Sequence, residues 1–227
     1  MEKKKILVTA GSTVAPIDQV RVISNIFNGR TGTEIALHFA VLGHEVTLLT
    51  SNKLLLYSAG SVARKIKTVI PYKEYDHLYR LMQLALCASA PPYDVVIHSA
   101  AVSDYSVADV GVKNERGEII PIDNSAKVSS DHAELFLRLV QTQKIIDLIR
   151  QPWEFAGYLV KFKLQVGITD EELLAIAEKS RVASQADMIV ANCLEWSRQR
   201  AYVMIADKVV NVERKNLATV LAQEILK

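Results

Sequence analysis

Residues 5–43, KILVTAGSTVAPIDQVRVISNIFNGRTGTEIALHFAVLG, decide the fold. The apolar run at 6–10 ends at Gly11, and a short apolar run without alternation is typical of a strand buried on both faces of a parallel sheet. Residues 33–42 carry apolar side chains at helical spacing and Gly43 supplies a stop, which predicts a helix. The polar loop between them has about 20 residues, whereas such connections usually have about two to six, so we expect it to carry function.

The alternation of strand and helix continues along the chain. It argues for a doubly wound, mainly parallel, Rossmann-like α/β sheet with helices on both faces and right-handed crossovers. The last two strands flank a turn at Asp207, as in a C-terminal hairpin. The pattern predicts strands at 45–50, 66–70, 94–99, 158–166, 188–191, 201–206 and 208–212, and helices at 75–88, 145–150, 169–184 and 216–226.

Residues 104–130 interrupt this pattern. They are polar and contain Gly111, Gly117 and Pro121, so we expect a flap or hairpin excursion over the C-terminal edge of the sheet. Residues 133–140 fit either a strand or a helix. Because the chain has no internal repeat and no low-complexity linker, we expect a single domain over 1–227.

Composition narrows the class of function. Of the 227 residues, 50% are hydrophobic and 23% charged, which is typical of a globular domain and not of a disordered chain. A net charge of +2 predicts no nucleic-acid partner, and the apolar run behind the N-terminal lysines is too short for an export signal or a membrane span. Two cysteines, Cys87 and Cys193, make no disulfide framework. We therefore expect a cytoplasmic protein with reduced thiols.

The end of the first loop is a candidate phosphate site. Residues 28–33, NGRTGT, stand at the predicted start of the first helix, where free backbone amides and the helix dipole favour an anion. Gly29 exposes the backbone and Arg30 adds charge. A plain capped helix after a long turn explains the same residues. Neither the dinucleotide fingerprint G-x-G-x-x-G nor a Walker sequence is present, so a phosphate would be held in another way.

Further polar residues stand at the ends of predicted strands. Arg21 offers a planar fork for a carboxylate or phosphate, and Asn25 can hold a carbonyl or an acyl-phosphate oxygen. From these residues alone, hydrogen bonds that only order the loop are the preferred explanation for both. Ala100 and Ala101 follow a predicted strand and let a flat ring approach the backbone, while Asp104 can accept from a base or ribose.

Lys127, His98 and possible metal ligands are further candidates for chemistry. Lys127 lies in the polar excursion and can close onto a triphosphate, although a solvated lysine is the plainer interpretation. His98, inside a predicted strand, is best explained as a packed or hydrogen-bonded histidine. No cluster of Cys, His, Asp or Glu has the spacing of metal ligands, so we expect no metal held by the protein alone.

Taken together, these segments resemble the phosphopantothenoylcysteine synthetase family, in particular its stand-alone bacterial form. The similarity lies in the order and spacing of several blocks and extends over essentially the whole chain. The matching blocks are TAGSTVAPIDQVRVISNIFNGRTG (9–32), HSAAVSDY (98–105), AKVSS (126–130), KII (144–146), FKL (162–164) and ADMIVAN (186–192).

The resemblance implies a ligase of coenzyme A biosynthesis. Such enzymes join 4′-phosphopantothenate to cysteine through an acyl-nucleotidylate, using CTP, or ATP, with Mg²⁺, and they are homodimers. Fused members carry a flavin-dependent decarboxylase ahead of this portion. Because this chain begins at the synthetase portion, no bound flavin is expected.

The resemblance also implies roles for individual residues. Asn25 would hold the acyl-nucleotidylate and present it to cysteine, Lys127 would act in its formation, and Arg21 would bind phosphopantothenate. The resemblance and the candidate phosphate site at the start of the first helix together predict the residues that bind the nucleotide. These residues are Gly11, Ser12, Gly29, Arg30, Ala100, Ala101, Asp104, Lys144, Phe162 and Lys179.

Departures from the family pattern keep two alternatives open. One is a non-catalytic relative with a degenerate phosphate site. Lys161 is a candidate to replace the charge that is missing at Ala183. The other is an NAD(P)-binding oxidoreductase, which would need a glycine fingerprint and an acid after the second strand, where residues 50–52 are TSN. The departing residues are Ser12 for a glycine, Phe27 and Asn28 for small polar residues, Lys161 for a glycine, Ala183 for a phosphate-facing lysine and Cys193 for an aspartate.

Overall fold

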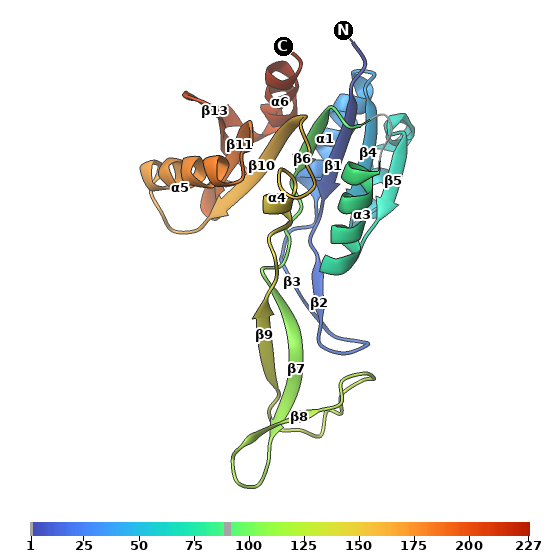
Figure 1. Cartoon of the computed structure of the whole chain (residues 1–227), viewed down its shortest axis with the longest axis vertical. Coiled ribbons are helices and arrows are strands. Elements are labelled where there is room, and N and C mark those ends of the chain that lie inside the picture. Colours follow the sequence, from blue (N-terminus) through green and yellow to red (C-terminus); the bar gives the residue numbers. More distant parts are fainter. Residues whose placement is uncertain (1, 89–91) are drawn as a thin grey trace.

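One eight-stranded sheet forms the centre of the fold (Figure 1). The computed structural model describes residues 2–88 and 92–227. The sheet consists of β1 (Lys5–Ala10), β4 (Glu45–Thr50), β5 (Thr68–Pro71), β6 (Val95–His98), β10 (Tyr158–Gln165), β11 (Met188–Cys193), β12 (Arg200–Ile205) and β13 (Lys208–Glu213). Their order is β13-β12-β11-β10-β6-β1-β4-β5, with the strands from β11 to β5 parallel and β12 and β13 antiparallel at one edge. This confirms the Rossmann-like prediction.

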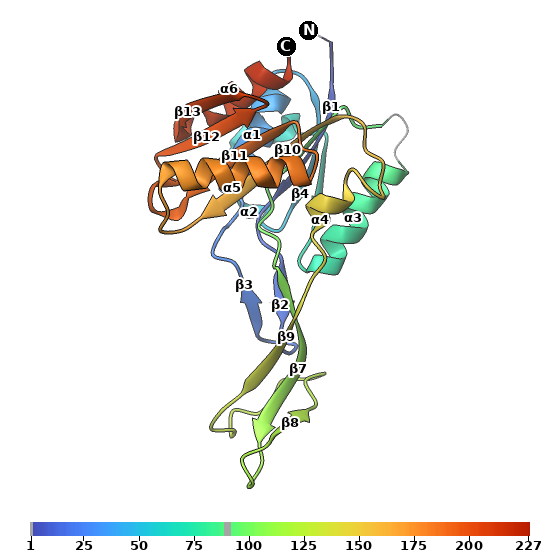
Figure 2. The ribbon, with the colours of Figure 1, turned by 60° about the vertical axis from the view of Figure 1, so that its left-hand side comes forward.

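Helices cover both faces of the sheet (Figure 2). The helices α1 (Arg30–Val41) and α6 (Leu217–Ile225) pack on one face in a single apolar cluster. The opposite face carries α3 (Tyr75–Cys87), α4 (Ile145–Leu148) and α5 (Asp170–Ala183), which bury two further clusters. A short helix, α2 (Leu54–Tyr57), follows β4.

The strand β1 shows why its sequence lacks alternation. Ile6 and Val8 belong to the cluster under α1 and α6, whereas Leu7 belongs to the cluster under α3 and α4. All three side chains are fully buried. A strand segment with apolar contacts on both faces is apolar at successive positions, as the sequence predicts for residues 6–8.

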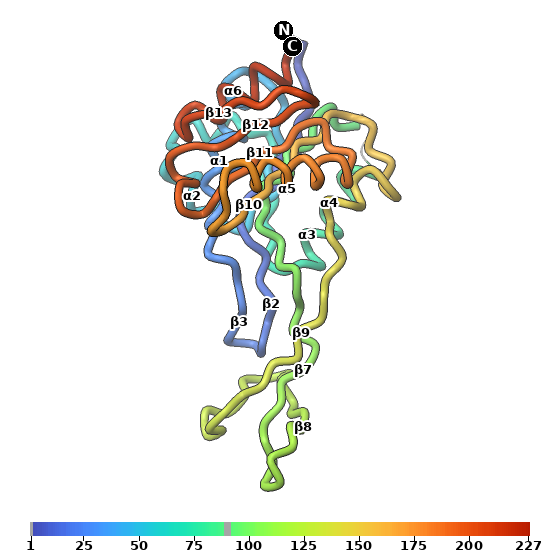
Figure 3. Tube along the Cα trace, turned by 90° about the vertical axis from the view of Figure 1, so that its left-hand side faces the viewer, coloured from blue at the N-terminus to red at the C-terminus, as the bar shows by residue number. Residues whose placement is uncertain are grey.

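Two β structures extend from the sheet, away from both chain termini (Figures 1 and 3). The hairpin, β2 (Val14–Pro16) with β3 (Val22–Ser24), is formed by the long first loop. The arm is a three-stranded sheet of β7 (Tyr105–Lys113), β8 (Ile119–Ile122) and β9 (Phe136–Gln141). The two lie side by side, because β2 contacts β7.

Most predicted elements occur within a few residues of their expected bounds. The excursion expected at 104–130 instead reaches Gln141, because Phe136–Gln141, which overlap the ambiguous segment 133–140, form β9 and pair with β7. The first helix begins at Arg30 and not at residue 33, so residues 30–33 of the candidate phosphate loop are already helical. The predicted cap of α5 is confirmed: Thr169 and Glu172 bond to each other's backbone amides in a capping box.

Among the described residues, no helix is long and apolar enough to cross a membrane.

Candidate active site

A cavity of about 1610 Å³ opens at the C-terminal ends of the central strands. Crossovers lead from β1 toward β4 on one side and from β6 toward β10 on the other. The cavity therefore lies at the topological switch point between β1 and β6, the place where open parallel sheets bind their ligands. Its walls come from the start of α1, the loop after β6, the segment before α4, the end of β10 and the inner face of α5.

The structure brings most of the expected site residues to this cavity. Ser12, Arg21 and Lys127 do not line it. The Ser12 hydroxyl instead lies 3.1 Å from that of Ser24 on the hairpin. The expected residues that do line the cavity are Gly11, Asn25, Gly29, Arg30, Ala100, Ala101, Asp104, Lys144, Phe162 and Lys179.

Asn25 joins the hairpin to the loop after β6. Its side-chain Nδ2 donates to the carbonyl oxygen of Ala101 at 3.1 Å. The backbone amide of Thr13 donates to the same carbonyl at 3.3 Å. Because the amide nitrogen is engaged with protein, the carbonyl oxygen of the Asn25 side chain is left for a ligand at the rim of the cavity.

The glycines of the first loop are required by close backbone packing. Gly29 has a φ of 86°, and a Cβ there would lie 2.5 Å from the backbone nitrogen of Gly11. A Cβ at Gly32 would lie 2.7 Å from the Cβ of Ala10. The start of α1 is thus pressed against the end of β1, so these glycines have a structural reason that is independent of any phosphate.

Arg214 is a cavity residue that the sequence analysis missed. Its guanidinium donates to the hydroxyl of Thr31 in the first turn of α1. Burial lowers its pKa, and Glu34 opposes that shift. No local pattern announces this contact, because the two bonded residues are separated by 183 positions in the chain.

The charge of the cavity favours a polyanion. Eight basic side chains line it, against four acidic ones. The basic residues come from six different parts of the fold, so the excess is a property of the cavity and not of one segment. The basic residues are Arg30, Lys144, Lys161, Lys163, Lys179, Arg198, Arg214 and Lys215, and the acidic residues are Glu34, Asp104, Asp147 and Glu195.

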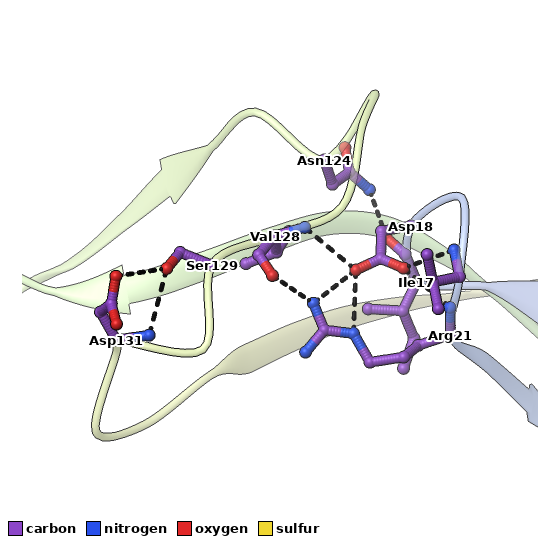
Figure 4. Close-up of polar contacts among 8 residues, drawn as sticks. Ile17, Asp18, Arg21, Asn124, Val128, Ser129 and Asp131 are labelled. Carbon is purple, nitrogen blue, oxygen red and sulfur yellow. Dashed lines mark hydrogen bonds and ion pairs between the residues drawn. The ribbon is translucent and has the colours of Figure 1, made fainter.

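Outside the cavity, a set of contacts that we call the clasp joins the hairpin turn to the arm (Figure 4). The Asp18 carboxylate accepts from Arg21 Nε at 2.9 Å and from the backbone amide of Val128 at 3.1 Å. Arg21 Nη2 in turn donates to the carbonyl of Val128 at 2.7 Å. The Asn124 amide donates to the carbonyl of Ile17 at 2.8 Å. Hydrogen bonding by Arg21 holds the pKa of Asp18 well below its usual range.

The clasp determines where Arg21 and Lys127 lie. Nε and Nη2 of Arg21 are used within the clasp, whereas no contact is present for Nη1 among the described residues. Lys127 immediately precedes Val128 and is exposed. The clasp thus fixes the backbone on the C-terminal side of Lys127.

No group of three or more His, Cys, Asp or Glu side chains that could hold a metal ion occurs in the described part of the chain. Mg²⁺ in nucleotide enzymes is commonly bound through substrate phosphates and one or two carboxylates. Asp104 and Asp147 line the cavity and fit that requirement.

Curated relatives of the chain include proteins named for coenzyme A biosynthesis. The coenzyme A biosynthesis bifunctional protein CoaBC of Thermococcus kodakarensis is 32% identical over 238 residues, which cover 100% of this chain and 52% of that protein. The protein of the same name from Escherichia coli is 28% identical over 222 residues, and the match covers 93% of this chain and 48% of that protein. The chain thus spans about half the length of these curated relatives.

Solved structures show the same fold at full length. The DNA/pantothenate metabolism flavoprotein of Streptococcus pneumoniae superposes with a TM-score of 0.79 at 30% identity, covering 98% of both chains. The C-terminal domain of a CoaBC protein, at 22% identity and a TM-score of 0.68, shares the fold. The family model described as the DNA/pantothenate metabolism flavoprotein C-terminal domain matches residues 1–227. With its switch-point cavity and the sequence blocks around it, this chain therefore belongs to the DNA/pantothenate metabolism flavoprotein C-terminal domain family.

Proposed function

We propose that the chain is a ligase that joins 4′-phosphopantothenate to cysteine in coenzyme A biosynthesis, with CTP or ATP and Mg²⁺. The observation that carries the proposal is the placement of Asn25. Its side chain is anchored on the loop after β6, at the rim of a cavity with an excess of basic residues. Family membership supports the same reaction class.

The reaction has two steps. A carboxylate oxygen of 4′-phosphopantothenate attacks the α-phosphorus of the nucleotide, and pyrophosphate leaves. The cysteine amine then attacks the acyl carbon, loses a proton and displaces the nucleoside monophosphate. The first step builds negative charge on phosphorus, which cations stabilise, and the second builds it on the acyl oxygen, which a hydrogen-bond donor or positioned amide stabilises.

The cavity offers a place for each part of the nucleotide. Ala100 and Ala101 give a flat ring access to the backbone, with the Asp104 carboxylate beside them. Phe162 lines the cavity and packs its inner side on the cluster under α1 and α6. Lys144 and Lys179 line the cavity and would neutralise the phosphates.

Arg21 and Lys127 act, in this proposal, where the arm and hairpin come together. Arg21 Nη1 would take the phosphate of phosphopantothenate while Nε and Nη2 stay in the clasp. Lys127 would contribute a cation during nucleotidylate formation. Neither lines the cavity of the single chain.

We further propose a homodimer. The hairpin and the arm carry large apolar side chains that are exposed in the single chain, with Ile26, beyond β3, 82% exposed. Such a surface on two projecting β structures is suited to burial against a second copy. The exposed residues are Val20, Val22, Ile23 and Ile26 on and beside the hairpin, and Tyr105, Leu139 and Val140 on the arm.

Three further expectations belong to this proposal. Residues 1–227 act as a single domain. The enzyme is cytoplasmic, which is supported by Cys87 and Cys193 both being free thiols. It carries no flavin, so the purified protein should lack the absorbance near ~450 nm of an oxidised flavin cofactor.

The deciding experiment measures pyrophosphate release from CTP, and separately from ATP, in the presence of phosphopantothenate and cysteine. Release with one nucleotide and formation of phosphopantothenoylcysteine support the proposal and identify the cosubstrate. Absence of release with both nucleotides would show a non-catalytic relative.

A further inference from the structure

Two buried polar side chains stand next to each other on the floor of the cavity. Lys161 of β10 and His98 of β6 are register partners on adjacent strands, and Thr9 of β1 is the register partner of His98 on the other side. Lys161 is 6% exposed and His98 7% exposed, and both line the cavity.

Thr9, His98 and Lys161 form a row of polar side chains across the sheet, next to a row of apolar side chains. Two residues earlier on the same strands and on the same face of the sheet, Leu7, Val96 and Leu159 are in register and belong to the cluster under α3 and α4. The sheet face thus changes from aliphatic to polar at the level where the cavity begins. Buried polar groups require hydrogen-bond partners, so each polar side chain of this row should have partners in the protein or in a ligand.

Lys161 is only partly satisfied by protein. Its Nζ donates to the carbonyl of Ser180 at 2.9 Å and to the hydroxyl of Ser184 at 2.8 Å, both at the end of α5. An ammonium has three donors, so one remains. Among the described residues no carboxylate forms an ion pair with it.

The charged groups around Lys161 do not compensate its burial. Burial is the main cause that lowers its pKa, to about 8. Lys163 on the same strand and Lys144 before α4 lower it further, while Asp147 of α4 acts in the opposite direction. Lys179 of α5 lines the same side of the cavity. A buried cation surrounded by other cations is a poor structural anchor, but it is well suited to an anionic ligand.

His98 presents a neutral donor beside this cation. Thr9 Oγ1 accepts from the backbone amide of Ala100 at 3.1 Å and lies 3.0 Å from His98 Nδ1. With the Thr9 hydroxyl assigned as the donor to Nδ1, the ring proton of the neutral imidazole lies on Nε2. Burial and Lys161 lower the pKa of His98 to about 4, so the ring stays neutral at physiological pH. For Nε2, no partner is present among the described residues.

We propose that Lys161 Nζ and His98 Nε2 form an anion subsite on the cavity floor that binds the polyphosphate of the nucleoside triphosphate. The inference rests on the proposed function for the identity of the ligand. Ala183 contributes only a methyl group to the α5 wall, so the wall leaves room for a phosphate to approach Lys161. Lys144, Lys163 and Lys179 surround the same space and make it suitable for a polyanion and not for a single carboxylate.

The test measures binding of inorganic triphosphate, and of CTP and ATP, by isothermal titration calorimetry. Lys161→Met keeps the length of the side chain and removes the charge, and His98→Leu removes the neighbouring donor. Lys53→Met is the matched control, because Lys53 is exposed and does not line the cavity. We expect triphosphate affinity to fall about tenfold or more in Lys161→Met, about threefold in His98→Leu and less than about twofold in Lys53→Met.

The outcomes separate this inference from the proposed function. If Lys161→Met remains folded and binds triphosphate as the wild type does, the subsite is overturned, whatever the pyrophosphate-release assay shows. If the wild type binds triphosphate through Lys161 but releases no pyrophosphate, the subsite holds and the ligase proposal fails. If the wild type binds none of the three ligands, the subsite is overturned as well.

Discussion

Asp18 and Arg21 form an ion pair in which the carboxylate has no exposed surface while 36% of the arginine side chain is exposed. The pair lies in the turn of the hairpin, and both partners also bond to the backbone of Val128 on the arm. Two segments separated by more than a hundred residues are therefore fixed to each other next to Lys127. The clasp makes the position of the arm depend on a carboxylate that has no contact with the cavity.

Removing the charge of Asp18 should impair catalysis without impairing nucleotide binding. Asp18→Asn weakens the bonds to Arg21 and Val128, so the arm near Lys127 becomes less well positioned. We expect kcat for nucleotidylate formation to fall about tenfold, because misplaced catalytic groups lose much of their effect, with a change of less than about twofold in the Kd for the nucleotide. Asp131→Asn, on the arm but outside the clasp, serves as the control. Equal losses in both variants would contradict a positioning role.

The same carboxylate predicts a specific response to acid. Its pKa is lowered in the folded chain, chiefly by Arg21. A lowered carboxyl pKa stabilises the fold above the unfolded value, about 4, and this stabilisation is lost as the pH falls toward the folded value. Thermal unfolding should therefore show wild type more stable than Asp18→Asn at pH 7, with a difference that shrinks between about pH 5 and 2. A constant difference over that range would show that the ionisation of Asp18 is not its source.

Asn25→Ala should separate the two chemical steps. The variant keeps the cations of the cavity, so it should still form the acyl-nucleotidylate and release about one equivalent of pyrophosphate. It should then stall, because the amide that holds the intermediate for cysteine is missing. Rapid-quench analysis with labelled phosphopantothenate measures both species. Asn211→Ala, on the edge strand β13, is the control, and normal product formation by Asn25→Ala would remove Asn25 from its role.

The sequence predicts best what is local. The apolar run that becomes β1, the Thr169 cap of α5 and the turn at Asp207 all depend on neighbouring residues, and each occurs as expected. The ion pair of Asp18 with Arg21 is also local, because the two residues are three positions apart, and an acid at that spacing is a sequence signal for such a pair. The role that the family resemblance implies for Arg21 is only that its side chain binds the substrate.

A local sequence pattern does not predict which residue on a neighbouring strand will contact a given residue. Nothing near Lys161 indicates that His98 stands beside it, because that contact follows from the strand order β10-β6 and its register. The bond from Arg214 to Thr31 depends in the same way on the return of the chain to α1. Within the ambiguous segment 133–140, the strand begins at Phe136, where pairing with β7 begins. These contacts arise from topology, which a local pattern does not encode.

A charge introduced on the hairpin side should separate the proposed dimer. Ile26 is 82% exposed in the single chain, and Ile26→Asp would place a carboxylate in the interface. Burying an unpaired charge is strongly unfavourable, so we expect the variant to be monomeric at micromolar concentration. Sedimentation velocity measures the mass of both proteins. Leu54→Asp on α2, also exposed in the single chain, should leave the dimer intact; a wild type that sediments as a monomer would contradict the proposal.

Lys161 should lower the stability of the free enzyme at neutral pH. Its pKa is about 8 in the fold against an ordinary value of 10.5, mainly because of burial. Below pH 8 the ammonium is charged in both states, so the full unfavourable effect of burial is present. Between pH 8 and 10.5 the unfolded chain holds more protons than the folded one, so stability rises with pH.

Lys161→Met removes this group, and the Ser184 hydroxyl still donates to the Ser180 carbonyl at 3.0 Å. We therefore expect the Tm of Lys161→Met to exceed that of wild type by about 2–6 °C at pH 7, with a gap that narrows toward pH 10. Lys53→Met should show no such gap, and a Lys161→Met protein less stable than wild type at pH 7 would mean that the two serine contacts outweigh the burial of the charge.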